Sequence, residues 1–79
     1  MLDAKTQEIL RDRDKRWQWI KLQLKISGSS LSAIARENEL NTSSIQIAHK
    51  KYYPRAQHLI AIKLDIEAHI LFEVFQITL

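Results

Sequence analysis

The sequence has no cysteine, and it has only one glycine and one proline among its 79 residues. Without cysteine, neither a disulfide framework nor a zinc finger can form. Gly28 and Pro54 are too few to supply the turns of an all-β fold of this size. The apolar runs are only a few residues long, so no segment is expected to span a bilayer. A chain of this length is expected to form one small domain, residues 1–79.

The first ten residues lack an apolar stretch as well. MLDAKTQEIL carries Asp3 and Glu8 and has no apolar region of the kind found in secretory signal peptides. Together with the absence of cysteine, this predicts a reducing, cytoplasmic setting.

Acidic residues are missing from one long stretch. Residues 40–64 contain no Asp or Glu, although 27% of the chain is charged. The basic residues of this acid-free window are Lys50, Lys51, Arg55 and Lys63, with His49 and His58 beside them. A basic surface without acids is typical of proteins that bind a polyanion such as nucleic acid. The alternative is a solvated helix face that happens to lack acids.

Helical spacing dominates the chain, and we predict an all-α bundle of four to five helices. The first long helix is expected over residues 12–26, where Trp17, Ile20 and Leu24 share a face. The alternation in WIKLQLKI leaves a strand as a competing interpretation. Residues 1–11 either extend this helix or fray, and Gly28 is expected to close it.

Shorter helices are expected over residues 30–38, 42–52, 54–64 and 67–71. Ser29 or Ser30 can cap the first of them, and Asn41 or Thr42 the second. Pro54 suits the first turn of the third, where its missing N–H is no loss. The buried face of that third helix is predicted to contain Ala56, Leu59, Ile60 and Leu64.

The helices at 30–38 and 42–52 fit the helix-turn-helix pattern, two short helices joined by a tight turn. Ala35 is small where the two helices would cross, and Leu40 is expected to point inward and fix the turn. At about 100° per residue, Ile45, Ala48 and Tyr52 form the buried side of the second helix.

The opposite side of that second helix carries the residues that we predict to contact DNA bases: Thr42, Ser43, Gln46, Ile47 and Lys50. The Gln46 amide offers the paired donor and acceptor that adenine requires, and Ile47 suits a thymine methyl group. The alternative interpretation is a polar helix cap followed by a lone surface isoleucine.

Residues 30–72 resemble the Ner family of phage transcriptional regulators and their bacterial Ner-like relatives. The resemblance rests on the SLSA opening, Arg36, the hydroxyl run at 42–44, Ile45, Ala48, Tyr53-Pro54-Arg55, Ile60-Ala61 and Leu64. It implies a lambda-repressor-like helical fold whose helix at 42–51 enters the major groove of an operator with two half-sites. It also implies repression or control of early promoters. A bacterial or phage protein of this kind would be associated with the nucleoid.

Contacts to DNA phosphates are expected from Ser30, Ser32, Arg36, Ser44, Lys51, Tyr53, Arg55 and His58. Basic and hydroxyl side chains are common phosphate contacts in protein–DNA complexes. At the turn, Asn38-Glu39 stands where the family usually has an apolar residue and glycine, so Glu39 is expected to adopt a left-handed backbone. Phe72 replaces the family's tryptophan, and residues 73–75 replace its Pro-Ser-Arg, so no phosphate contact is transferred to them.

No catalytic or metal site is expected. His49, His58 and His69 are 9 and 11 residues apart, without cysteine or a repeating carboxylate pattern. No set of nucleophile, base and orienting group emerges, and no glycine-rich loop is present to hold a phosphate. We therefore expect a protein that is not an enzyme and has no cofactor and no small-molecule substrate. His49 is expected to be a packing residue at the border of the buried face.

The C-terminal tail, residues 73–79, continues a largely apolar run that begins at Ile70. Either Phe72 and Phe75 complete the core, or the tail forms a homodimer contact that suits an operator with two half-sites.

The sequence as a whole predicts a sequence-specific regulator, of the repressor type, that binds double-stranded DNA. The alternative is a helical protein–protein interaction module that has kept the fold without DNA binding. An unbroken basic surface over residues 42–55 would favour DNA, whereas a surface neutralised by acids would favour a protein partner.

Deleting residues 75–79 tests the role of the tail. If the tail holds a dimer, the truncated protein is expected to be a folded, helical monomer that binds a two-half-site operator weakly. Sedimentation and circular dichroism would show this. Loss of folding would instead favour the core role, and a full-length protein that stays monomeric on DNA would exclude the dimer.

Overall fold

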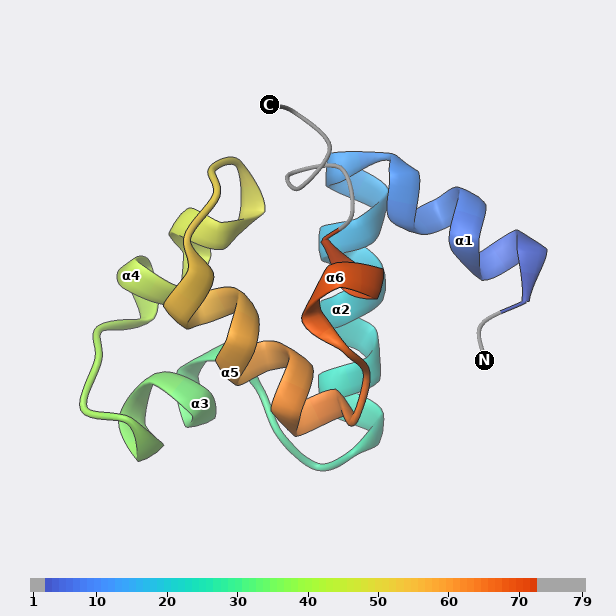
Figure 1. Ribbon diagram of the computed structural model, residues 1–79. Helices are drawn as coiled ribbons and strands as arrows, with labels where there is room; N and C mark the ends of the chain where they lie inside the picture. The colour runs from blue at the N-terminus through green and yellow to red at the C-terminus, as the bar shows by residue number, and fades with distance from the viewer. Residues whose placement is uncertain (1–2, 73–79) are drawn as a thin grey trace.

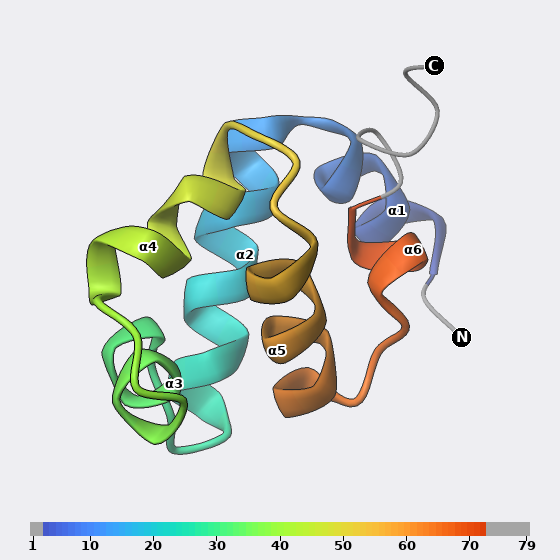
Figure 2. The same cartoon turned by 60° about the vertical axis from the view of Figure 1, so that its left-hand side comes forward.

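The computed structural model describes residues 3–72, and over this range the protein is all-helical, which confirms the predicted fold class. The elements are α1 (Ala4–Arg11), α2 (Arg13–Ile26), α3 (Leu31–Glu37), α4 (Thr42–Gln46), the 3₁₀ turn η1 (Ile47–His49), α5 (Pro54–Leu64) and α6 (Ala68–Leu71). Helices α3 and α4 lie at one end of the molecule and α1 and α6 at the other, with α2 and α5 between them (Figures 1 and 2).

Helices α1 and α2 are separate because Asp12 interrupts the chain between them. Its backbone is extended, and its Oδ1 accepts hydrogen bonds from the N–H groups of Asp14 and Lys15, both at 3.0 Å. The bond from Lys15 lowers the pKa of Asp12 because it stabilises the carboxylate. This cap starts α2 where the sequence predicts it, and the strand interpretation of WIKLQLKI is wrong because those residues lie within α2.

Within two residues after the ends of α2, α3 and α5, the chain has a left-handed backbone, at Gly28 (φ 77°), Glu39 (φ 56°) and Asp65 (φ 57°) respectively. Each end shows the same pair of hydrogen bonds. At the end of α3, the Leu40 N–H donates to the Ala35 carbonyl at 2.7 Å, and the Glu39 N–H donates to the Arg36 carbonyl at 3.3 Å. This is a Schellman motif, which turns the chain sharply and satisfies carbonyls at the end of the helix. The left-handed backbone predicted for Glu39 is confirmed.

Among residues 3–72, one charged side chain lies in the core. Arg16 is 1% exposed, and its Nη1 donates to the Leu10 carbonyl at 3.0 Å. Its guanidinium carbon lies 5.6 Å from the centre of the Phe72 ring, and Phe72 is fully buried. Burial lowers the pKa of Arg16 below its usual value. Arg16 thereby connects the end of α1, α2 and the end of α6. The core role predicted for Phe72 is confirmed, whereas Phe75 and the rest of the tail lie outside the described residues.

The predicted helix over residues 42–52 is the main difference from the sequence analysis. Helix α4 ends at Gln46, and η1 ends at His49. Ile45 and Ala48 are fully buried as predicted, but Tyr52 is 58% exposed, so its predicted burial is wrong. A 3₁₀ turn advances about 120° per residue rather than about 100°. The chain then leaves the helix, and a helical wheel extended to Tyr52 no longer applies.

Replacing Glu39 by glycine is expected to raise the free energy of unfolding by about 0.5–1 kcal/mol, because glycine adopts the left-handed backbone without strain. Asp65→Gly is the matched comparison. It has a similar φ, but aspartate tolerates this region better than glutamate, so the gain should be smaller. Urea denaturation of both variants and the wild type measures the difference. A destabilised Glu39→Gly would show that the strain at Glu39 is smaller than the stability that glycine loses through the greater entropy of the unfolded chain.

Candidate nucleic-acid interface

Helix α3, the turn at residues 38–41 and α4 form a helix-turn-helix. Ala35 and Ile45 are buried where α3 and α4 pack together, and Leu40 packs against the core from the turn. A larger side chain at position 35 would push the two helices apart, because protein cores leave little free space. The predicted roles of Ala35, Leu40 and Ile45 in holding the motif are confirmed.

Four of the five predicted base-contacting residues are exposed: Ser43, Gln46, Ile47 and Lys50. Ile47 is 46% exposed although both Ile45 and Ala48 are fully buried, so α4 and η1 present a two-sided surface. Thr42 is half-buried, and its hydroxyl lies 3.5 Å from the Ser32 hydroxyl, next to the first turn of α3. The first turns of α3 and α4 therefore meet at these two hydroxyl groups.

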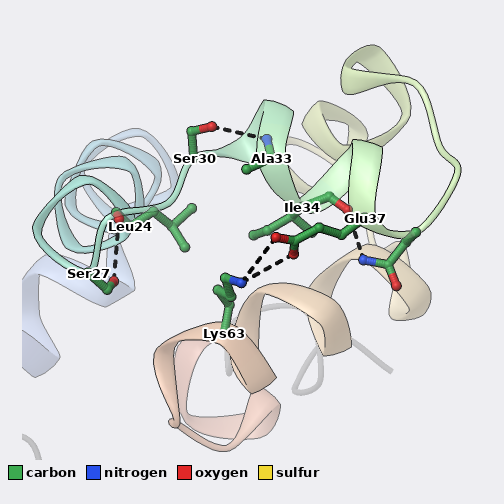
Figure 3. A network of polar contacts seen from close by, with 8 residues as sticks. Leu24, Ser27, Ser30, Ala33, Ile34, Glu37 and Lys63 are labelled. Carbon is green, nitrogen blue, oxygen red and sulfur yellow. Dashed lines mark hydrogen bonds and ion pairs between the residues drawn. The ribbon is translucent and has the colours of Figure 1, made fainter.

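The residues predicted to contact phosphates include both exposed and half-buried side chains. Ser32, Arg36, Lys51, Arg55 and His58 are exposed, and Ser44 and Tyr53 are half-buried. Ser30 is exposed and caps α3, since its hydroxyl oxygen accepts the Ala33 N–H at 3.0 Å (Figure 3). Tyr53 packs against the core and precedes Pro54, which occupies the first turn of α5 as predicted.

One basic residue of the acid-free window is neutralised by an acid from outside it. Lys63 Nζ, on α5, lies 3.2 and 3.5 Å from the two carboxylate oxygens of Glu37 on α3 (Figure 3). This ion pair joins α3 to α5, and the Glu37 carboxylate offsets the positive charge of Lys63. The unpaired positive charges of the acid-free window are therefore near the end of η1 and the start of α5, at Lys50, Lys51 and Arg55.

The first turn of α2 also belongs to this region, although it lies outside the acid-free window. Arg13 Nη1 donates to the Lys50 carbonyl at 3.4 Å, and Asp14 Oδ1 lies 2.8 Å from His49 Nε2. The Trp17 ring stacks on the His49 ring with 5.1 Å between centres and 1° between planes. His49 is a packing residue as predicted. Its partners are 32 to 35 residues earlier in the chain, and the only sequence signal is that positions 13, 14 and 17 share one side of α2.

These contacts form an open hollow beside the exposed side of α4 and η1. It is lined by Trp17, Gln46, Ile47, His49, Lys50 and Lys51. An amide, an apolar side chain and two ammonium groups thus surround one concave surface. This combination of groups suits a nucleic acid, which presents base edges beside phosphates.

The structure also bears on other classes of site. Within residues 3–72, no group of three or more His, Cys, Asp or Glu side chains is arranged to hold a metal ion. None of the helices in this range combines the length and the hydrophobicity needed to cross a bilayer.

Residues 16–73 match the family described as winged helix-turn-helix DNA-binding. The match covers most of the chain, from Arg16 in α2 through α6, and it confirms the predicted helix-turn-helix DNA-binding domain without reaching the narrower Ner family. No curated protein and no solved structure matches the chain. A wing is built from β-strands, and residues 3–72 contain none.

Proposed function

This chain belongs to the winged helix-turn-helix DNA-binding family, and we propose that it regulates transcription by binding double-stranded DNA sequence-specifically through α4 and η1. The observation that carries this proposal is the two-sided surface of α4 and η1. Ile45 and Ala48 are fully buried, whereas Gln46 and Ile47, between them in the chain, are exposed. A recognition helix needs this arrangement, because one side must be held by the core while the other enters the major groove.

Base recognition would combine polar and apolar contacts. The Gln46 amide can pair with the N6 and N7 groups of adenine, and Ile47 can contact the methyl group of a neighbouring thymine. Ser43 and Thr42, in the first turn of α4, can reach base edges or phosphates, and Lys50 can reach a guanine or a phosphate.

Phosphate contacts would fix the orientation of α4 on the duplex. Lys51 and Arg55 supply positive charge after η1 and in the first turn of α5. Ser30 and Ser32, at the start of α3, supply hydroxyl groups that can bind phosphates. We further propose phosphate contacts for Arg36, Ser44, Tyr53 and His58. These contacts carry no sequence information, but they supply much of the affinity and its dependence on salt.

The resemblance to Ner proteins supports a repressor that acts on an operator with two half-sites. We further propose, from the apolar character of the C-terminal tail, that a homodimer formed through this tail binds such an operator. Two protomers related by a two-fold axis match two related half-sites. In this proposal the protein is a non-enzymatic regulator that works in the cytoplasm, at the nucleoid of a bacterial cell.

The second candidate function is protein–protein interaction without DNA binding. One observation favours it: the Asp14 carboxylate is 78% exposed and lies beside η1, so the basic surface is not unbroken. Arg13, Lys50 and Lys51 nevertheless leave an excess of positive charge around this single acid. DNA is therefore the better-supported partner.

Salt dependence tests the proposal against this alternative. With about 3–5 phosphates contacted per protomer, a plot of log affinity against log salt concentration is expected to have a slope of about −3 to −4.5 per protomer. Fluorescence titration of a duplex selected from random sequences, at several salt concentrations, measures the slope. A slope near zero would leave the protein-interaction module as the remaining function.

Gln46→Ala tests whether α4 reads bases. This variant is expected to lose about 1–3 kcal/mol of binding free energy on the selected duplex and to relax preference at one base pair. Lys51→Ala is the matched control, because Lys51 is exposed near the end of the same surface. It should weaken binding to selected and scrambled duplexes about equally and reduce the magnitude of the salt slope by about one.

Thermal melting should show that both variants remain folded, since neither side chain is in the core. If Gln46→Ala weakened both duplexes equally, Gln46 would not be a base reader, and the placement of α4 in the major groove would fail with it.

A further inference from the structure

The DNA-contacting segment is too short to hold its own shape. Helix α4 has five residues and η1 has three. Helices shorter than about 12 residues are marginal in water on their own. A 3₁₀ turn has poorer hydrogen-bond geometry than an α-helix. The directions of Gln46, Ile47 and Lys50 must therefore be set by contacts with the rest of the protein.

Two kinds of contact hold η1. On its buried side, Ala48 is fully inaccessible and anchors the turn to the core. Towards α2, the His49 ring lies flat on Trp17, which is itself only 4% exposed. A ring that lies parallel to a buried indole has its plane restrained, and this contact links η1 to α2.

Asp14 adds a polar restraint to this stack. Its Oδ1 lies 2.8 Å from His49 Nε2, which sets the rotation of the imidazole within its plane. One residue before Asp14, Arg13 donates to the Lys50 carbonyl at the C-terminal end of η1. The first turn of α2 thus contacts two successive residues where the DNA-contacting segment ends.

We propose that Asp14 and Trp17 are positioning residues, which act through His49 to orient Gln46, Ile47 and Lys50 for base recognition. This inference rests on the proposed function. It gives Asp14 a favourable role in recognition, whereas its negative charge alone would only oppose DNA binding. An exposed carboxylate beside a DNA-binding surface repels phosphates, so removing it should tighten binding to every duplex. If Asp14 positions the segment, removing it should lower discrimination between sequences.

The experiment compares Asp14→Ala with Glu8→Ala, using a duplex selected with the wild type and a scrambled duplex at one salt concentration. Glu8 is an exposed acid on α1, at the other end of the molecule from α4, so the control removes the same charge (Figure 1). Asp14→Ala is expected to lower the ratio of selected to scrambled affinity about fivefold or more, within the range of coupling between contacting residues. Glu8→Ala should leave the ratio unchanged.

His49→Phe provides a second variant that keeps an aromatic ring on Trp17 but lacks the nitrogen that meets Asp14. It should lose discrimination as Asp14→Ala does, and the double variant should lose little more, because the two changes remove one interaction. In a Trp19→Phe background, the fluorescence of Trp17 reports the stack directly. Asp14→Ala should change this emission, and Glu8→Ala should not.

The outcomes separate the two proposals. A wild type that prefers no duplex would remove the proposed function and this inference with it. A wild type that discriminates, together with Asp14→Ala binding both duplexes more tightly at an unchanged ratio, would overturn the positioning role alone. Unchanged Trp17 emission in Asp14→Ala would also overturn it, because the carboxylate would then not hold the stack.

Discussion

The shortness of the helices is the constraint on which the rest of this structure depends. Between residues 31 and 49, and again between residues 68 and 72, no helical element of the described chain is longer than seven residues. Such elements are unstable in isolation, and they persist only where their apolar side chains are buried together. Three of these elements, and α5 between them, are each held in place by a fully buried side chain: Ile45 in α4, Ala48 in η1, Ile60 in α5 and Leu71 in α6.

This constraint couples the core to the proposed DNA surface. Each exposed residue of α4 and η1 lies within three positions of a buried one, so a shift of Ile45 or Ala48 would move Gln46 and Ile47 as well. Core substitutions are therefore expected to affect recognition as well as stability, because packed interiors transmit small displacements. The Arg16 guanidinium acts at a second location. It ties the carbonyl of Leu10 to the ring of Phe72, and so joins the two ends of the described chain.

The electrostatic potential of a surface depends on which charges the fold brings together. Counting charges along the sequence therefore misjudges two positions, Lys63 and Asp14. Lys63 belongs to the acid-free window but pairs with Glu37. Asp14 lies 26 residues before the window begins, yet it meets His49 within it. The surface proposed to meet DNA therefore contains four basic residues, Arg13, Lys50, Lys51 and Arg55. It also contains the acid Asp14, which contacts His49. Two side chains of the acid-free window, Lys63 and His49, thus lie beside acids from outside it.

The sequence by itself determined the helical class, the start of α2 next to Asp12, the turn at Gly28, a serine cap of α3 at position 29 or 30, and the entry of α5 at Pro54. These features depend on backbone preferences and hydrogen bonds within a few residues, which a linear pattern records. It also determined that Ile45 and Ala48 are buried while Gln46 and Ile47 are exposed. Only the tertiary structure decided that the second helix of the motif tightens into a 3₁₀ turn and exposes Tyr52. It also decided that Asp14 and Trp17 meet His49, because contacts between residues more than 30 positions apart depend on how α2 packs against η1.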